Sequence, residues 1–166
     1  MDYICQIGFL KRKDKFKLNI NIICVGKLKE KYLKDAIKEY QKRLSKYTKL
    51  EIIELPDYNY DTVKTKIEEG KNILSKITDK DFVDTLEING KVLDSIDLSS
   101  FIDKNISRNI TFVIGGSNGL SDDVLKRSDY SLSFSKLTFP HQLFRILLLE
   151  QIYRSFKIIN NERYHK

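Results

Sequence analysis

The last residues of the chain are of types that can carry acid–base chemistry. Tyr164, His165 and Lys166 end the sequence, and His165 is one of two histidines. An unperturbed histidine has a pKa of about 6.5, so His165 can accept a proton at neutral pH. Tyr164 can stack on a flat ligand, and Arg154 or Lys166 can hold a phosphate. The alternative is an ordinary frayed terminus.

A glycine-rich segment is the second candidate for chemistry. Three of the seven glycines lie within residues 115–119, which read GGSNG and follow the apolar run at residues 110–114. Glycine has no Cβ atom, so the backbone there can approach a ligand closely. The segment matches neither G-x-G-x-x-G nor G-x-x-x-x-G-K-[ST], which argues against a dinucleotide-binding enzyme. A simple turn would use the same glycines.

The elements that position these residues alternate between strand and helix. Apolar runs and alternating patterns predict strands at residues 20–25, 50–55, 81–88, 110–114 and 131–134. Spacings of three and four residues predict helices at about residues 28–47, 63–77, 97–103, 122 onward and 140–158. Asn89 and Gly90 are expected to end the third strand, Ser121 to cap the fourth helix, and Pro140 to lie in the first turn of the last one. The order predicts an α/β fold with a mostly parallel sheet and flanking helices.

Three loops of this fold are expected to converge. In an open α/β sheet a ligand binds beyond the carboxyl ends of the strands. Residues 86–91, 115–119 and 135–140 all follow predicted strands, and each has an unusual composition. We therefore expect one ligand between these loops. We interpret His141, which follows the third loop, as a hydrogen-bonding group at the start of a helix.

Composition excludes several classes of protein. The chain has 166 residues, of which 41% are apolar, and it has two cysteines and no apolar run long enough to span a bilayer. No Cys/His cluster has zinc spacing, so we expect neither a metal site nor a disulfide framework. Residues 19–49 include nine basic and three acidic residues, whereas residues 50–104 include seven basic and thirteen acidic residues. This uneven charge indicates a polyanionic partner.

The N-terminal segment has no regular pattern. We predict that residues 1–18 form an extension outside the core and that residues 19–166 form a single domain. The extension is basic at its end and lacks the charge-then-apolar order of a signal peptide, so we expect a cytoplasmic protein. It is either the result of an upstream start codon or a basic arm that contacts RNA.

Four segments together resemble a known family. IICVGKL at residues 22–28, FVIGGSNGL at residues 112–120, SKLTFPHQL at residues 135–143 and the terminal residues 164–166 are similar to the SPOUT-class large-subunit ribosomal RNA methyltransferase H family. The resemblance covers residues 19–166. It implies a homodimer with a trefoil-knotted C-terminal half that binds S-adenosylmethionine (SAM). The implied reaction is methyl transfer to N3 of a pseudouridine in the 23S ribosomal RNA helix at the subunit interface, on assembled ribosomes.

The resemblance also implies a cofactor site on the three loops. Its residues would be Leu86, Gly116, Ser135, Lys136, Leu137, Thr138, Phe139 and Pro140. Apolar pockets with few polar anchors suit an adenine ring. Asp84 departs from the pattern, because it stands in the third strand where we expect an apolar residue. The strand register, and with it the placement of Leu86, therefore stays open.

The implied chemistry needs few side chains. Methyl transfer from a sulfonium to nitrogen depends mainly on aligning the two reactants, although the N3 proton must have an acceptor. His165 is the candidate base, and Tyr164 and Arg154 are candidates for positioning the substrate. The alternative function is a non-catalytic ribosome-binding factor on the same fold.

Two helices have surfaces open to more than one interpretation. The first places Lys31, Lys34, Lys38, Lys42 and Lys46 along one face, either to bind RNA phosphates or as a solvated surface. The last helix is apolar over more than one stripe, which favours either a dimer interface or complete burial within the chain.

Overall fold

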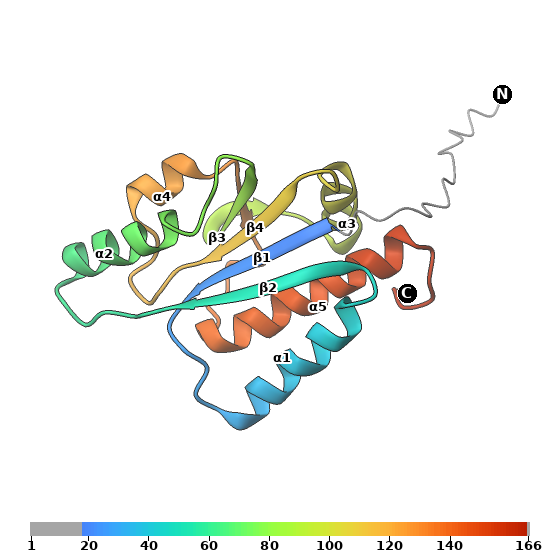
Figure 1. Ribbon diagram of the computed structural model, residues 1–166, viewed down its shortest axis with the longest axis horizontal. Helices are drawn as coiled ribbons and strands as arrows, with labels where there is room; N and C mark the ends of the chain where they lie inside the picture. The colour runs from blue at the N-terminus through green and yellow to red at the C-terminus, as the bar shows by residue number, and fades with distance from the viewer. Residues whose placement is uncertain (1–17, 166) are drawn as a thin grey trace.

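The computed structural model describes residues 18–165, in which strands and helices alternate (Figure 1). The strands are β1 (Leu18–Val25), β2 (Thr48–Leu55), β3 (Asp81–Val92), β4 (Asn109–Ile114) and β5 (Tyr130–Ser133). The helices are α1 (Lys31–Leu44), α2 (Thr62–Leu74), α3 (Ser95–Lys104), α4 (Asp122–Arg127) and α5 (His141–Ile159). Within these residues the strands form one parallel sheet in the order β2-β1-β4-β3-β5. The predicted α/β fold is confirmed.

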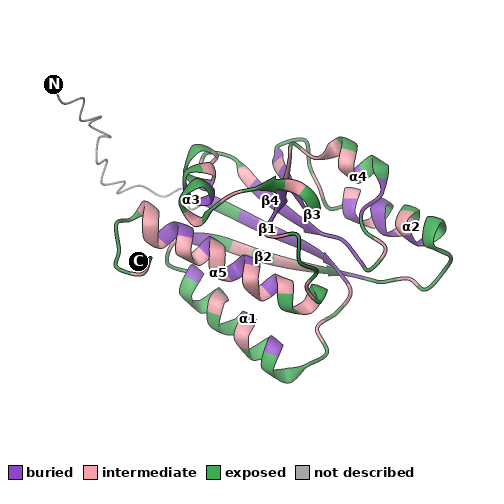
Figure 2. Ribbon diagram, turned by 180° about the vertical axis from the view of Figure 1, so that it is seen from behind, coloured by how far each residue is buried: buried purple, intermediate pink, exposed green. Residues whose placement is uncertain are grey.

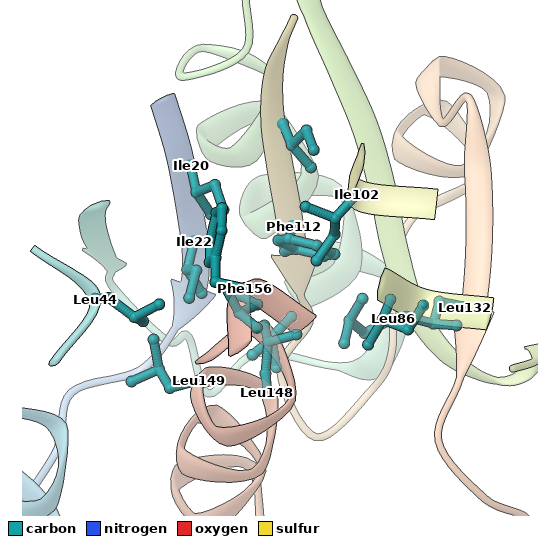
Figure 3. Close-up of a cluster of buried hydrophobic side chains, with 14 of the residues drawn as sticks. Ile20, Ile22, Leu44, Leu86, Ile102, Phe112, Leu132, Leu148, Leu149 and Phe156 are labelled. Carbon is teal, nitrogen blue, oxygen red and sulfur yellow. The ribbon is translucent and has the colours of Figure 1, made fainter. Parts of the chain in front are cut away.

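Helices cover both faces of the sheet, so its central strands are buried on both sides. In β1, Ile20 and Ile22 pack with α1, α3 and α5, whereas Ile23 packs with α2 and α4 on the other face. Figure 3 shows the larger of these two cores. Burial of one such side chain contributes roughly 2 kcal/mol. Burial on both faces explains why β1 reads as an almost continuous apolar run.

The third strand does not end where the sequence predicted. β3 continues through Asn89 and Gly90 to Val92, and its pairing with β5 shifts register between Leu86 and Lys91. A Cβ atom on Gly90 would lie 2.6 Å from the backbone carbon of Leu132. Gly90 is therefore required by the close approach of two strands at a bulge, and not by a chain-reversing turn.

Other boundaries differ by a few residues. Helix α1 is shorter at both ends than predicted, and β5 begins at Tyr130 instead of Ser131. Pro140 immediately precedes α5 and does not lie in its first turn. The predicted cap of α4 is confirmed, because the Ser121 hydroxyl accepts a hydrogen bond from the Val124 backbone N–H.

The predicted extension, residues 1–18, lies outside the described residues except for Leu18. Leu18 is paired with Thr48 in the sheet and is buried, so the folded part of the chain includes it. Among residues 18–165, no helix is both long and apolar enough to cross a membrane.

Candidate active site

A cavity of about 410 Å³ opens at the carboxyl edge of the sheet. Residues from the ends of β3 and β4 and from the segment between β5 and α5 line it together, including Leu86, Gly116 and Ser135. The three loops therefore converge on one cavity, as expected. Asp84 pairs with Phe112 and Leu86 with Ile114. This register places Leu86 at the cavity wall.

The cavity wall is largely apolar and partly aromatic. The wall includes Leu132 of β5, Phe134 and Phe139 of the following loop, and Phe144 of α5. The ring centres of Phe134 and Phe144 lie 4.9 Å apart, and those of Phe139 and Phe144 lie 6.1 Å apart. Such a wall suits a flat aromatic ligand, which gains from burial and from ring contacts.

Two serine hydroxyls hold the third loop in shape. The Ser133 hydroxyl donates to the Ser135 carbonyl oxygen at 3.1 Å. The Ser135 hydroxyl accepts from the Leu137 backbone N–H at 2.8 Å, and the Leu137 side chain is 70% exposed. Tight local hydrogen bonds of this kind fix a loop without burying it.

Gly116 is needed for packing behind the cavity. A Cβ atom on Gly116 would lie 2.8 Å from Glu69 Oε2 and 3.1 Å from a methyl carbon of Val25. The expectation that the missing side chain leaves space for a ligand is therefore wrong at Gly116. Its Cβ direction points to α2 and β1, and a larger residue would first displace Glu69.

The predicted cofactor residues do not all meet at this cavity. Six of them line it: Leu86, Gly116, Ser135, Leu137, Thr138 and Phe139. Lys136 is exposed and lines no cavity described for residues 18–165, and Pro140 lines the neighbouring one. Sequence reasoning missed Lys66 and Phe144 as wall residues. Phe144 lies one helical turn after Pro140, so its spacing offered a signal, whereas Lys66 offered none.

A second cavity of about 530 Å³ adjoins the first. Gly116, Ser117 and His141 line both cavities. The second also includes Lys27 and Lys29 between β1 and α1. The two cavities therefore form neighbouring parts of one site at the carboxyl edge.

Arg145 joins the start of α5 to the ends of two strands. Its side chain is buried, and Nη1 lies 2.8 Å from Glu54 Oε1 in an ion pair. Nη2 donates to the backbone carbonyls of Val25 at 3.0 Å and Gly26 at 2.7 Å. This guanidinium fixes the start of α5 against the sheet edge, and removing it would leave buried acceptors without partners.

Glu69 is a buried carboxyl group between the glycine loop and the loop after β2. Its Oε1 accepts from the Tyr58 backbone N–H at 3.4 Å, and Oε2 has no hydrogen-bond partner among the described residues. Burial raises the pKa of Glu69, and the nearby Asp57 raises it further. The side chain lies directly behind Gly116 and supports that loop.

The three predicted catalytic residues lie together around Glu150. The Tyr164 hydroxyl donates to Glu150 Oε2 at 2.9 Å, and Arg154 Nη2 lies 2.7 Å from Glu150 Oε1. Arg154 also lies over the Tyr164 ring, 4.8 Å from its centre, and its Nη1 is 3.4 Å from His165 Nδ1. Partial burial, followed by the hydrogen bond to Glu150, raises the pKa of Tyr164. Sequence reasoning did not identify Glu150, and Lys166 lies outside the described residues.

The tail, residues 160–165, follows the C-terminal end of α5 (Figure 1), whereas His141 and Phe144 at the start of α5 line the cavity. The helix has 19 residues, so its ends are about 28 Å apart. Tyr164 and His165 line neither cavity. Within one chain, the tail therefore does not reach over the cofactor site.

His141 begins α5 at the rim of both cavities. Its side chain is exposed and makes no hydrogen bond within residues 18–165, so the interpretation as a helix-start hydrogen-bonding group is wrong. Partial desolvation lowers the pKa of His141, and the positive charge of Arg145 lowers it further. No group of three or more His, Cys, Asp or Glu residues that could hold a metal ion occurs in the described part of the chain.

Comparison with known proteins identifies relatives along the folded chain. Residues 18–165 match the family model described as predicted SPOUT methyltransferase. The ribosomal RNA large subunit methyltransferase H of Clostridium botulinum is 57% identical over 159 residues, covering 90% of this chain and 100% of the relative. Ribosomal RNA large subunit methyltransferase H 1 of Clostridium perfringens is 55% identical with the same coverage. Among solved structures, the SpoU methyltransferase AviRb from Streptomyces viridochromogenes, in complex with AdoMet, has a TM-score of 0.46 and 10% identity, covering 89% of this chain and 61% of that one.

Proposed function

Because this chain belongs to the SPOUT methyltransferases, and among them to the ribosomal RNA large subunit methyltransferase H family, we propose that it transfers a methyl group from SAM to 23S ribosomal RNA. The acceptor is N3 of a pseudouridine in the helix at the subunit interface. The observation that supports this function best is the apolar cavity formed by three strand-end loops. We also propose that the protein acts in the cytoplasm, where its ribosomal substrate is found.

The residues of the cavity fit the cofactor. Apolar and aromatic walls from Leu86, Leu132 and Phe139 accept the adenine ring. The backbone of residues 115–117, Ser135 and Thr138 supplies polar groups. Bound SAM supplies an electrophilic methyl group on a positively charged sulfur. The chain's own part is to hold that group and the acceptor nitrogen in line and to exclude water.

The N3 proton requires an acceptor, and His165 is the residue we propose for it. Its Nδ1 lies 3.4 Å from Arg154 Nη1, so the guanidinium holds the ring in place, and an imidazole nitrogen can accept a proton. Glu150 forms an ion pair with Arg154 and accepts a hydrogen bond from Tyr164, so Glu150, Arg154 and Tyr164 form a preorganised group beside His165. We propose that Tyr164 stacks on or hydrogen-bonds the target base and that Arg154 positions the RNA.

The distance between the tail and the cavity favours a homodimer. A symmetric dimer can place the tail of one subunit at the cavity of the other. Large apolar side chains are exposed near this edge: Tyr32 is 68% exposed, Leu137 70% and Leu143 40%. In contrast, Leu148, Leu149, Ile152 and Phe156 of α5 are buried in this chain's own core (Figure 3). Packing within the chain thus uses part of the apolar surface of α5, and we propose that the exposed cavity rim, which includes Leu143 at the start of α5, forms the dimer surface.

Two measurements test the proposed function. Calorimetry should detect SAM binding without added metal, and radiolabelled SAM should methylate ribosomal RNA at one pseudouridine N3, located by mass spectrometry of RNA fragments. Free ribosomal RNA, large subunits and whole ribosomes should be compared, and we expect whole ribosomes to be methylated fastest. SAM binding with no transfer to any of the three would favour the alternative, a ribosome-binding factor that is not catalytic.

A further inference from the structure

The outer face of α1 carries a row of lysines that nothing in the fold uses. We call Lys31, Lys34, Lys38, Lys42 and Lys46 the α1 lysine stripe; the first four lie in α1, Lys46 follows it in the turn before β2, and all five are exposed. The side chains of the first four make no hydrogen bond or ion pair among residues 18–165. The positive charge of Lys46 helps to lower the pKa of Glu162. Most of α1 is coloured as exposed in Figure 2.

The α1 lysine stripe lies opposite the face that packs against the core. Leu33, Ile37 and Leu44 are the buried residues of α1. At 100° per residue, Lys31, Lys38 and Lys42 fall on the other side of the helix, and Lys34 lies at the flank. Lysines spaced by four residues repel one another and weaken the helix. Glu39, the acid closest to the middle of the stripe in sequence, pairs with Arg43 instead, at 2.8 Å. The stripe therefore does not stabilise the fold.

The stripe also begins beside the proposed active site. Lys27 and Lys29, both exposed, precede α1 and line the second cavity with Gly116 and Ser117, which also line the first. From there α1 extends about 21 Å alongside α5 (Figure 1). Basic groups thus recur from the cavity rim to the far end of the helix, where they outnumber the exposed acids between them, Glu30, Asp35 and Glu39.

We propose that the α1 lysine stripe, together with Lys27 and Lys29, binds consecutive phosphates of the ribosomal RNA and guides the target nucleotide to the cavity. This inference rests on the proposed function and names the surface that holds its substrate. The stripe has charge without an apolar face, which distinguishes it from a membrane-binding helix. Lysines in a row suit a phosphate backbone, where each contact contributes to affinity and to its salt dependence.

The test compares two triple variants with equal changes in charge. The stripe variant combines Lys34→Gln, Lys38→Gln and Lys42→Gln. The control variant changes three exposed lysines outside α1: Lys76→Gln, Lys80→Gln and Lys104→Gln. Binding to whole ribosomes is measured between 50 and 200 mM salt, methyl transfer is measured with radiolabelled SAM, and SAM affinity is measured by calorimetry.

The stripe variant should bind SAM like wild type but bind ribosomes roughly 10-fold or more weakly, and its slope of log affinity against log salt should fall by about 2. Methyl transfer at low ribosome concentration should fall with the affinity, and the control variant should stay near wild type. If both variants bind ribosomes equally well, or lose affinity equally, the stripe is not the docking surface. If wild type itself transfers no methyl group to RNA, the proposed function fails, but the ribosome-binding comparison still decides the role of the stripe.

Discussion

Replacing Asp84 by asparagine should stabilise this protein, because the carboxyl group of Asp84 is buried without a partner. Asp84 is 0% exposed in β3, and neither carboxyl oxygen has a hydrogen bond in the described residues. Burial raises the pKa of Asp84 from 3.8 to about 8, and the backbone of Leu132 opposes this rise only in part. The native carboxyl group is therefore protonated at neutral pH, whereas in the unfolded chain it is ionised.

This difference in pKa sets the sign and the size of the effect. Between pH 3.8 and about 8 the unfolded chain releases a proton that the native protein keeps, so the free energy of unfolding falls by about 1.4 kcal/mol per pH unit. Below pH 3.8 Asp84 is protonated in both the native and the unfolded state, and above about pH 8 it is ionised in both. In these two ranges the contribution of Asp84 to the free energy of unfolding does not change with pH. At pH 7 Asp84 thus lowers stability by up to about 4 kcal/mol. An asparagine cannot ionise, and its unpaired amide reduces the expected gain to about 3 kcal/mol.

Urea denaturation at several pH values tests this prediction. The stability difference between Asp84→Asn and wild type should increase from pH 5 to pH 7 and level off above pH 8. Asp103→Asn, a change of the same type at an exposed position, should show almost no difference. An Asp84→Asn variant that is no more stable at pH 7, with a pH dependence parallel to that of wild type, would refute the inference that the buried group is neutral.

Three further predictions concern the site. Gly116→Ala should lower the free energy of unfolding, measured by urea denaturation, by about 2 kcal/mol, because the new methyl group meets the Glu69 carboxylate. The double variant with Glu69→Ala should recover part of this loss. Arg145→Met should lower stability by about 3 kcal/mol, because it removes a buried guanidinium that pairs with the half-buried Glu54 and holds two backbone carbonyls. A change below about 1 kcal/mol would contradict this. Deletion of residues 164–166 should leave the SAM affinity measured by calorimetry almost unchanged but lower methyl transfer by about 10²–10⁴-fold. The single variant His165→Ala should reproduce much of this loss of methyl transfer if the imidazole is the base.

Much of the fold and part of the site could be predicted because they depend on local patterns. Alternating and three-to-four-residue spacings predicted the order of strands and helices, and position after a strand predicted the three loops. Gly90 was misinterpreted because a turn and a bulge use the same residue type. Its role depends on how closely the backbone of Leu132 approaches, which no local pattern records.

Long-range contacts account for most of what could not be predicted. Arg145 is one of four charged residues in α5, and nothing nearby in the sequence marks it as buried, because its partner Glu54 is 91 residues away. Glu150 likewise gains its role from Tyr164, which only the folding back of the tail brings near. The separation of the tail from the cavity follows from the length of α5, which the sequence predicted closely, and from its direction, which is known only once the helix is placed on the sheet.

A mixing experiment tests most directly whether the cavity of one subunit and the tail of its partner form one methylating site. One variant, Thr138→Trp, fills the cavity from an exposed loop position, and calorimetry should show that it no longer binds SAM. The other lacks residues 164–166 and keeps its cavity. Each variant alone should be almost inactive on ribosomes. After exchange of subunits in an equal mixture, half of the dimers contain one subunit of each variant, and each of these dimers has one intact site of two. The mixture should therefore regain about a quarter of wild-type methyl transfer. A mixture that exchanges subunits but stays as inactive as its components would contradict the account.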